Sequence, residues 1–179
     1  MRNIVVCLLA FTFAGCLGIS PEEARRRSIG DGDEDREEEH NPGTPCLACH
    51  DRDFNPGDDV FAVAGTVFLQ VEDPDTMGLA GVSVFVRDAR GREFEAITND
   101  AGNFMFEVKE RDRERIEMRG QGKTRLSFWP EYPLETWIEQ GGIEQRMETL
   151  IERDGSCATC HDGDPSARSV GRVFLMETP

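Results

Sequence analysis

The sequence predicts a mainly β protein, an antiparallel β-sandwich flanked by two Cys-x-x-Cys-His segments and preceded by a disordered acidic N-terminal tether. Two observations lead to this expectation. Between residues 60 and 152, short runs rich in Val, Phe, Ile and Thr alternate apolar with polar positions, as strands do. At 179 residues, 38% of them apolar, the chain has the size of one ordinary domain with attached segments.

The first fifteen residues have the features of a secretory signal. A single charge at Arg2 precedes the apolar run IVVCLLAFTFAG, which is too short to span a membrane. The run ends in FAGC, which resembles the bacterial lipoprotein box. That resemblance implies that Cys16 becomes the new N-terminus and is acylated on its sulfur. The alternative is an ordinary signal peptide that is cut nearby and leaves Cys16 as a thiol.

The segment 16–44 is expected to be a flexible acidic tether. It contains PEEARRR and DGDEDREEEHNPGTP, and so few apolar residues cannot bury enough surface to fold alone. The whole chain has 35 acidic residues against 20 Lys and Arg, a net charge of −15. This charge disfavours nucleic acid as a partner, because phosphates need cationic side chains. An acidic surface can instead steer a basic redox partner into encounter.

The expected strands follow one another between short turns. Gly91 and Gly102, in DARGRE and NDAGN, can supply the positive φ that hairpin turns need. Pro130 and Pro133 interrupt the last of these strands. Seven strands would complete a sandwich. The expected segments are VFAVAGTVFLQV (60–71), GVSVFVRDA (81–89), REFEAIT (92–98), NFMFEV (103–108) and TRLSFW (124–129).

Residues 134–152, LETWIEQGGIEQRMETLIE, fit two structures. The spacing of Ile143, Met147 and Leu150 suits a helix, whereas Gly141 and Gly142 between two alternating runs suit a hairpin turn. We favour the hairpin, because the sandwich needs further strands.

Six cysteines divide by position. Cys7 leaves with the signal and Cys16 is the anchor candidate. The other four form two CxxC pairs, and a histidine directly follows each pair. A disulfide framework suits an exported chain but does not explain the histidines. A zinc site made of both pairs fits the spacing, yet structural zinc thiolates occur mainly where thiols stay reduced.

Covalent c-type haem accounts for every residue of both motifs. Two thiols add to the vinyl groups of the porphyrin, and the adjacent histidine binds the iron. The sequence therefore predicts two c-type haems, and the whole β region between the motifs suggests that the two sites are independent. The expected haem-binding residues are Cys46, Cys49 and His50 for the first haem, and Cys157, Cys160 and His161 for the second.

The second axial ligands are restricted by the histidine count. Of three histidines only His40 lies outside the motifs, so a monomer can have at most one bis-histidine iron. The other iron would take methionine, another group or a histidine of a second chain, or would stay five-coordinate. Met147, ten residues before Cys157, and Met176 near the C-terminus are the leading thioether candidates. Each can equally be a packing residue, as Met105 in NFMFEV is expected to be.

Each motif is followed by an acidic turn and a G-x-V-F-L segment, at 65–69 and at 171–175. This short echo suggests that the last segment returns to the sheet. If the first and last strands are neighbours, both motifs lie at one end of the sandwich.

Part of the β region resembles the carboxypeptidase regulatory-like, or prealbumin-like, β-sandwich family. The resemblance implies a binding or structural module and no catalytic residue. The combination with a lipoprotein signal and CxxCH motifs is also similar to multidomain exported bacterial cytochromes. The matching positions are Gly65 and Val67 of a G-x-V strand, residues 78–84 (GLAGVSV), Asp88 and Gly91 of a D-x-x-G turn, and Thr98, Gly102 and Phe104 of a T-x-x-x-G-x-F segment.

The expected organisation is a signal peptide (1–15), a lipidated tether (16–44), a first haem-binding segment (45–59), the sandwich (60–152) and a second haem-binding segment with a returning strand (153–179). The favoured function is electron transfer between exported redox proteins by a membrane-anchored dihaem cytochrome, more a carrier than an enzyme. One alternative is a haem enzyme or gas sensor with an open iron position. The other is a structural or ligand-binding lipoprotein with disulfides at the CxxC pairs. Leu17, where retention in an inner membrane would favour aspartate, makes the outer membrane, facing the periplasm or the cell surface, the expected location.

Overall fold

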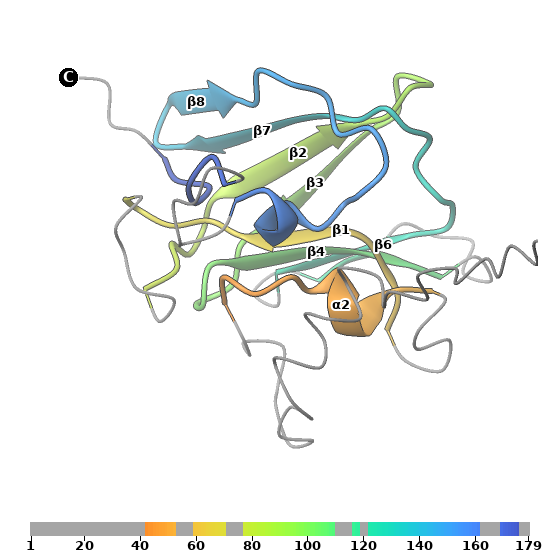
Figure 1. The fold of residues 1–179 in the computed structure, drawn as a ribbon, viewed down its shortest axis with the longest axis horizontal. Coiled ribbons are helices and arrows are strands. Elements are labelled where there is room, and N and C mark those ends of the chain that lie inside the picture. Colours follow the sequence, from red (N-terminus) through yellow and green to blue (C-terminus); the bar gives the residue numbers. More distant parts are fainter. Residues whose placement is uncertain are drawn as a thin grey trace, which may run out of the picture.

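The computed structural model describes residues 42–52, 59–70, 77–109, 116–118, 122–161 and 169–175. This part of the chain is mainly β, with two four-stranded sheets and only short helical turns (Figure 1). The prediction of a mainly β fold is confirmed at this level. No helix among the described residues is long and apolar enough to cross a bilayer. The predicted signal peptide, Cys16, His40, most of the tether and Met176 lie outside the described residues.

The first sheet has the order β1 (Phe61–Thr66), β4 (Asn103–Val108), β6 (Lys123–Leu126) and β5 (Ile116–Met118). β1 pairs antiparallel with β4, whereas β4 and β6 pair in parallel. The prediction of purely antiparallel pairing is therefore wrong for this sheet. The reason is β5, which precedes β6 in sequence and pairs antiparallel with it at the sheet edge, so that the chain reverses before β6.

The second sheet has the order β3 (Glu93–Ile97), β2 (Ser83–Arg87), β7 (Glu135–Gln140) and β8 (Ile143–Arg146), all antiparallel. The preference for a hairpin in residues 134–152 is confirmed by β7 and β8. Gly141 and Gly142 form the turn at φ 62° and 84°, where a side chain would be strained. Positive φ is also found at Gly91 and Gly102, as the sequence predicts.

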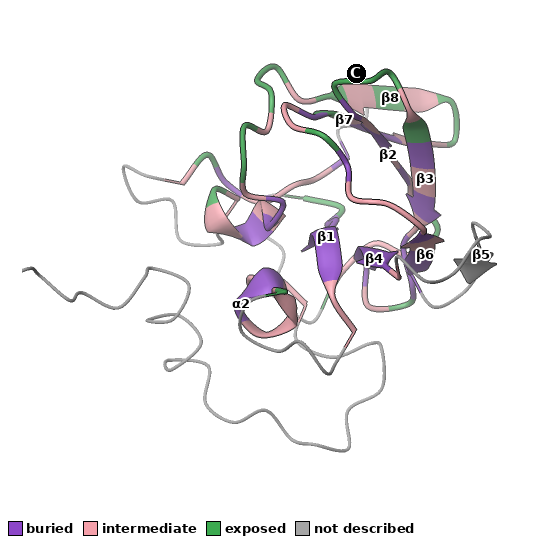
Figure 2. Cartoon of the chain, turned by 90° about the vertical axis from the view of Figure 1, so that its right-hand side faces the viewer, coloured by how far each residue is buried: buried purple, intermediate pink, exposed green. Residues whose placement is uncertain are grey.

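The two sheets pack face to face, as in a β-sandwich, with the main apolar core between them. Alternate residues of β2, such as Val84 and Val86, point into this core, where Phe94 meets Phe106 edge-on at 5.0 Å between ring centroids. Every residue of β1 and β4 is buried, because a smaller apolar cluster covers their other face (Figure 2). The first sheet is therefore packed on both sides near β1.

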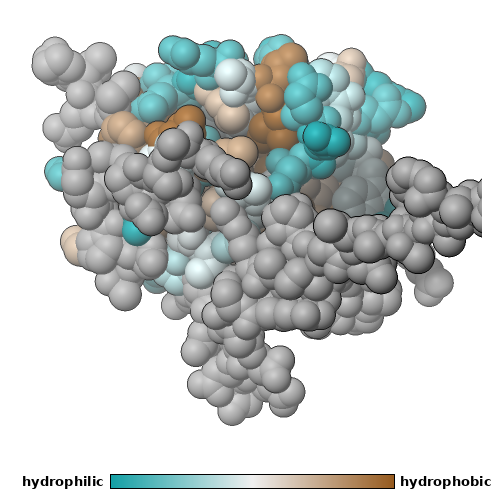
Figure 3. Space-filling view, in the orientation of Figure 1, coloured by the Kyte–Doolittle hydropathy of each residue, from teal (hydrophilic) through white to brown (hydrophobic). Residues whose placement is uncertain are grey.

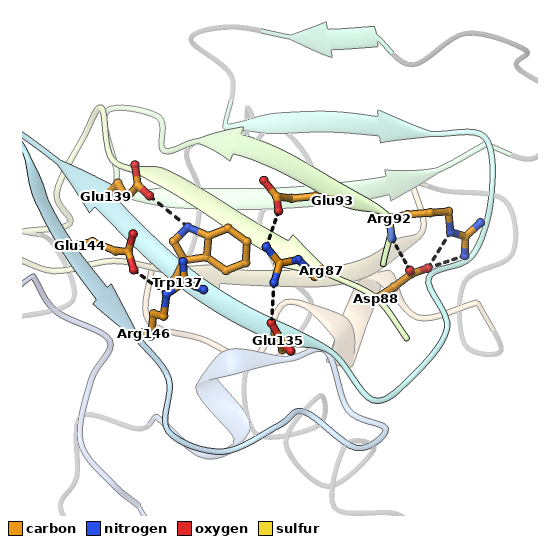
Figure 4. Close-up of polar contacts among 9 residues, drawn as sticks. All are labelled: Arg87, Asp88, Arg92, Glu93, Glu135, Trp137, Glu139, Glu144 and Arg146. Carbon is orange, nitrogen blue, oxygen red and sulfur yellow. Dashed lines mark hydrogen bonds and ion pairs between the residues drawn. The ribbon is translucent and has the colours of Figure 1, made fainter. Parts of the chain in front are cut away.

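The outer face of the second sheet carries an aromatic pair shielded by arginines (Figure 4). Trp137 stacks on Phe85 at 5.1 Å, and the guanidinium groups of Arg87 and Arg146 lie 5.2 and 4.3 Å from the centre of a Trp137 ring. Trp137 is only 4% exposed as a result. Cation–π contact and the aliphatic stems of the arginines stabilise an aromatic residue that would otherwise face water.

Asp88 links the turn after β2 to the chain that precedes β7 by hydrogen bonds. Its buried carboxylate accepts hydrogen bonds from the Arg92 side chain at 2.7 Å and from the N–H groups of Arg90, Arg92 and Glu131 (Figure 4). Burial alone would raise the pKa of Asp88, but these hydrogen bonds and the Arg92 charge outweigh it and lower the pKa below 3.8.

We expect Asp88→Asn to destabilise the protein by about 2 kcal/mol at pH 7, because Arg92 loses its ionic acceptor. A carboxyl whose folded pKa is lowered stabilises the fold above its unfolded pKa, and that stabilisation is lost as pH falls through the folded pKa. Urea unfolding at pH 7 and pH 2.5 tests this. The gap between wild type and variant should shrink at the lower pH, and a gap independent of pH would contradict the assignment.

Candidate functional site

The two CxxCH motifs adopt the same backbone turn. The first includes helix α2 (Leu47–His50), and the second includes the short 3₁₀ helix η1 (Cys157–Thr159). In each, the carbonyl of the first cysteine accepts hydrogen bonds from the second cysteine and from the histidine. The N···O distances are 3.2 and 3.1 Å in the first motif and 3.2 and 2.8 Å in the second. The residue after the first cysteine, Leu47 or Ala158, is buried in both.

This turn brings the three functional side chains of each motif to one side. Residues three and four positions apart are neighbours on a helical surface, so the first cysteine lies beside both the second cysteine and the histidine. Two sulfurs and one imidazole on the same face are the groups that one porphyrin would engage. The same geometry occurs in both motifs, although the sequences around them differ.

Each motif histidine is oriented by a backbone carbonyl. His50 Nδ1 lies 2.9 Å from the Asp59 carbonyl oxygen, and His161 Nδ1 lies 2.9 Å from that of Gly171. A carbonyl only accepts, so Nδ1 must carry the proton, and a neutral ring then has its lone pair on Nε2. A hydrogen bond from the ring nitrogen that does not bind the metal is the usual way in which a metal-binding histidine is fixed. His50 is further held by stacking on Phe61, with ring centroids 4.5 Å apart.

Both motifs pack against β1. Cys46 and Leu47 join the small apolar cluster that contains Ala64 and buries the outer face of the first sheet. On the free edge of β1, the Ala64 N–H donates to the Gly155 carbonyl at 3.0 Å, just before the second motif. A Cβ added to Gly65 would lie 2.7 Å from Cys157 Cβ. Figures 1 and 2 show α2 beside β1.

The two motifs, which the β region separates in sequence, therefore lie on the same strand: β1 contacts the first through Ala64 and the second through Gly65. The independence of the two haem sites stays a prediction. Burial is the largest cause of the raised pKa of Cys157, and proximity to Cys46 adds to it.

The second motif belongs to a loop closed at both ends on the edge of β1. Ser156 bridges to Ala64, and beyond the motif Phe174 bridges in parallel to Phe68, which continues from β1. Phe68 donates to the Val173 carbonyl at 2.9 Å and accepts from Leu175 at 3.2 Å. The two G-x-V-F-L segments of the sequence echo thus lie next to one another, joined by a bridge that is not part of either four-stranded sheet.

The first cysteine of each motif is partly buried. Burial raises the pKa of the Cys46 thiol to about 11 and that of Cys157 to about 12. Burial disfavours a thiolate, which zinc would require, and tolerates an uncharged thioether. The four described cysteines are not joined by disulfides, and no three described His, Cys, Asp or Glu side chains are grouped to hold a metal ion.

An aromatic loop before β7 contacts the surroundings of both motifs. The Tyr132 hydroxyl donates to the Ala62 carbonyl of β1 at 3.3 Å, and the Arg52 guanidinium, two residues after His50, lies 5.6 Å from the Trp129 ring centre. Burial, followed by the charges of Asp154, Cys157 and Asp51, raises the pKa of Tyr132 to about 12. Tyr132 therefore lies near residues of both motifs.

The methionines predicted as candidate ligands are placed differently. Met105 is a packing residue, as expected, and lies in the cluster beneath the first motif. Met147 follows β8, and its N–H donates to the Thr136 carbonyl at 3.1 Å. Met147 stays a prediction as a thioether ligand.

Sequence reasoning missed the residues that support the motifs. Asp59 and Gly171 act through main-chain carbonyls, which carry no residue-type signal. The sequence identifies Gly65 only as part of a G-x-V strand pattern, not as a contact of the second motif. Phe61 and Tyr132 were not distinguishable from other aromatic residues of the β region.

Comparison of the chain with protein-family models, with curated proteins and with solved structures gave no match. The candidate site therefore rests on the geometry of the two motifs.

We expect Gly65→Ala to displace the second motif, because its Cβ would lie 2.7 Å from Cys157 Cβ and 3.1 Å from the Phe104 ring. Overpacking of this kind costs about 1–3 kcal/mol. Urea unfolding should show this loss of unfolding free energy. Intact-mass measurement should show that fewer chains carry the predicted covalent haem on Cys157 and Cys160. Unchanged stability and attachment in Gly65→Ala would contradict the close approach.

Proposed function

We propose that this chain is a membrane-anchored dihaem c-type cytochrome that transfers electrons between exported redox partners. The observation that carries the proposal is the repeated arrangement of two cysteines and a carbonyl-bound histidine on one helical turn. When bound, each haem would supply one-electron exchange between ferric and ferrous iron.

The residues present fit this group. Cys46 and Cys49, or Cys157 and Cys160, would hold the two vinyl carbons, and His50 or His161 would present Nε2 to the iron. Burial of the first sulfur favours an uncharged thioether over a thiolate. Next to the second motif, the Val170 N–H donates to the main-chain carbonyl oxygen of Cys160 at 3.1 Å. The Cys160 residue is exposed, and Val170 is 74% exposed.

The charge of the chain favours a carrier that meets its partners by encounter. Sequence net charge is −15, and the face drawn in Figure 3 is largely hydrophilic where it is described. Such a surface attracts basic proteins at long range and releases them easily at physiological salt. The resemblance to carboxypeptidase regulatory-like domains supports a scaffold role for the sandwich, and the FAGC sequence supports a lipid anchor at Cys16 in the outer membrane.

Expression with a c-type maturation system should give a chain whose mass includes two haem groups. Cys157→Ala with Cys160→Ala should remove one haem, and Cys46→Ala with Cys49→Ala should remove the other. A mature chain without covalent haem would refute the proposal. Loss of both haems in either double variant would mean that attachment at one motif depends on the other across β1.

Cys16→Ser should abolish acylation and release the protein from membranes, because serine has no sulfur for the lipid. Fractionation and mass of the N-terminal peptide measure this, with Cys7→Ser as the matched control within the predicted signal. A Cys16→Ser chain that is still acylated would rule out the anchor.

A further inference from the structure

We propose that Asp59 is a positioning residue that ties the orientation of His50 to a network of charged side chains, and so sets the reduction potential of the first iron separately from that of the second. The inference rests on the proposed function. It concerns residues that neither the motif pattern nor the family resemblance singles out.

Asp59 has two roles at once. Its main-chain carbonyl accepts the His50 Nδ1 hydrogen bond at 2.9 Å, while its carboxylate bonds to Lys123 Nζ at 2.8 Å and to Lys109 Nζ at 3.3 Å. The carboxylate is therefore held by both lysines, with the shorter bond to Lys123.

The lysine at this junction is itself fixed. The Lys123 side chain is only 6% exposed, on β6, whose neighbour β4 carries the fully buried Glu107. Glu107 is paired with Arg125 at 2.7 Å and with Lys109 at 2.9 Å. Ion pairs with little exposure hold their geometry better than surface pairs do. The Asp59 carbonyl is therefore anchored to the middle of the first sheet.

Among the described residues, the carbonyl that holds the second histidine belongs to a residue with no charged side chain of its own. The acceptor of this histidine is the carbonyl of Gly171, which has no side chain, and the Gly171 N–H is bonded to the Ser169 hydroxyl at 3.1 Å. The two motifs thus share their backbone turn and their histidine tautomer but differ in what fixes the acceptor. A change in the network should affect the first iron and leave the second as an internal control.

The direction of the effect follows from the hydrogen bond. A firm Nδ1–H···O bond raises the basicity of the imidazole, which favours ferric iron and lowers the potential. Removing the bond from Lys123 to Asp59 weakens the His50 hydrogen bond and should raise the reduction potential of the first iron. Loss of a nearby positive charge acts in the opposite direction, because it favours ferric iron. Replacing Lys123 by a neutral residue therefore separates positioning from simple electrostatics by the sign of the shift.

The test is a redox titration of the full-length dihaem protein carrying Lys123→Met. We expect the potential of the first iron to rise by about 59 mV, a tenfold shift in its one-electron equilibrium. The potential of the second iron should not change. The first iron is assigned in the Cys157→Ala, Cys160→Ala variant, which retains only that haem.

Two matched variants complete the design. Lys109→Met removes the same charge from the same carboxylate but leaves the Lys123 bond, so the potential of the first iron should fall or stay constant. Lys123→Arg restores a cationic donor and should return the potential towards wild type. If Lys123→Met does not accumulate as folded protein, Asp59→Ala takes its place. Its readout is the electron paramagnetic resonance of the ferric protein, which should change for the first iron alone.

The outcomes separate the two levels of the proposal. A wild-type chain without covalent haem overturns the proposed function and the inference with it. A dihaem chain in which Lys123→Met lowers the first potential, as Lys109→Met does, or shifts both irons equally, overturns the inference alone. If Asp59→Ala leaves the ferric spectrum of the first iron unchanged, the inference alone is likewise overturned.

Discussion

The pairing capacity of β1 is the constraint on which the site depends. One edge of this strand is satisfied by β4, and the other would expose unpaired N–H and carbonyl groups, as any edge strand does. Residues 155–156 and 173–175 cover that edge, and α2 covers the outer face. The position of both CxxCH turns is therefore fixed by β1, which must complete its hydrogen bonds and bury its apolar side chains.

The two motifs form similar turns in different surroundings. Cysteine spacing, the backbone hydrogen bonds of the turn and the histidine tautomer are the same in both. The surroundings differ, because one histidine stacks on Phe61 and bonds to the carbonyl of a charged residue, whereas the other bonds to the carbonyl of a glycine. If the chain holds two haems as proposed, their potentials would differ through the sheet and not through the motifs.

The sequence predicted what depends on local pattern and missed what depends on long-range contacts. Alternation located β1 to β4, β6 and the β7–β8 hairpin, because a half-buried strand repeats every two residues. β5 lies among charged residues and gave no such signal, and the parallel β4–β6 pair follows from its insertion. The motif residues were identifiable from spacing. Their supports were not, since Asp59 and Gly171 act through their backbones, and the approach of Gly65 to Cys157 exists only once the chain is folded.

The closed loop around the second motif has a consequence for the order of assembly. Contacts between Ala64 and Ser156, and between Phe68 and Phe174, join the beginning of the β region to the end of the described chain. Such contacts are entropically costly to form early, so hairpins such as β7–β8 should fold before this edge closes. Until it closes, Cys157 is not yet packed against Gly65. If the chain binds haem as proposed, attachment at the second motif would be easiest before this contact forms.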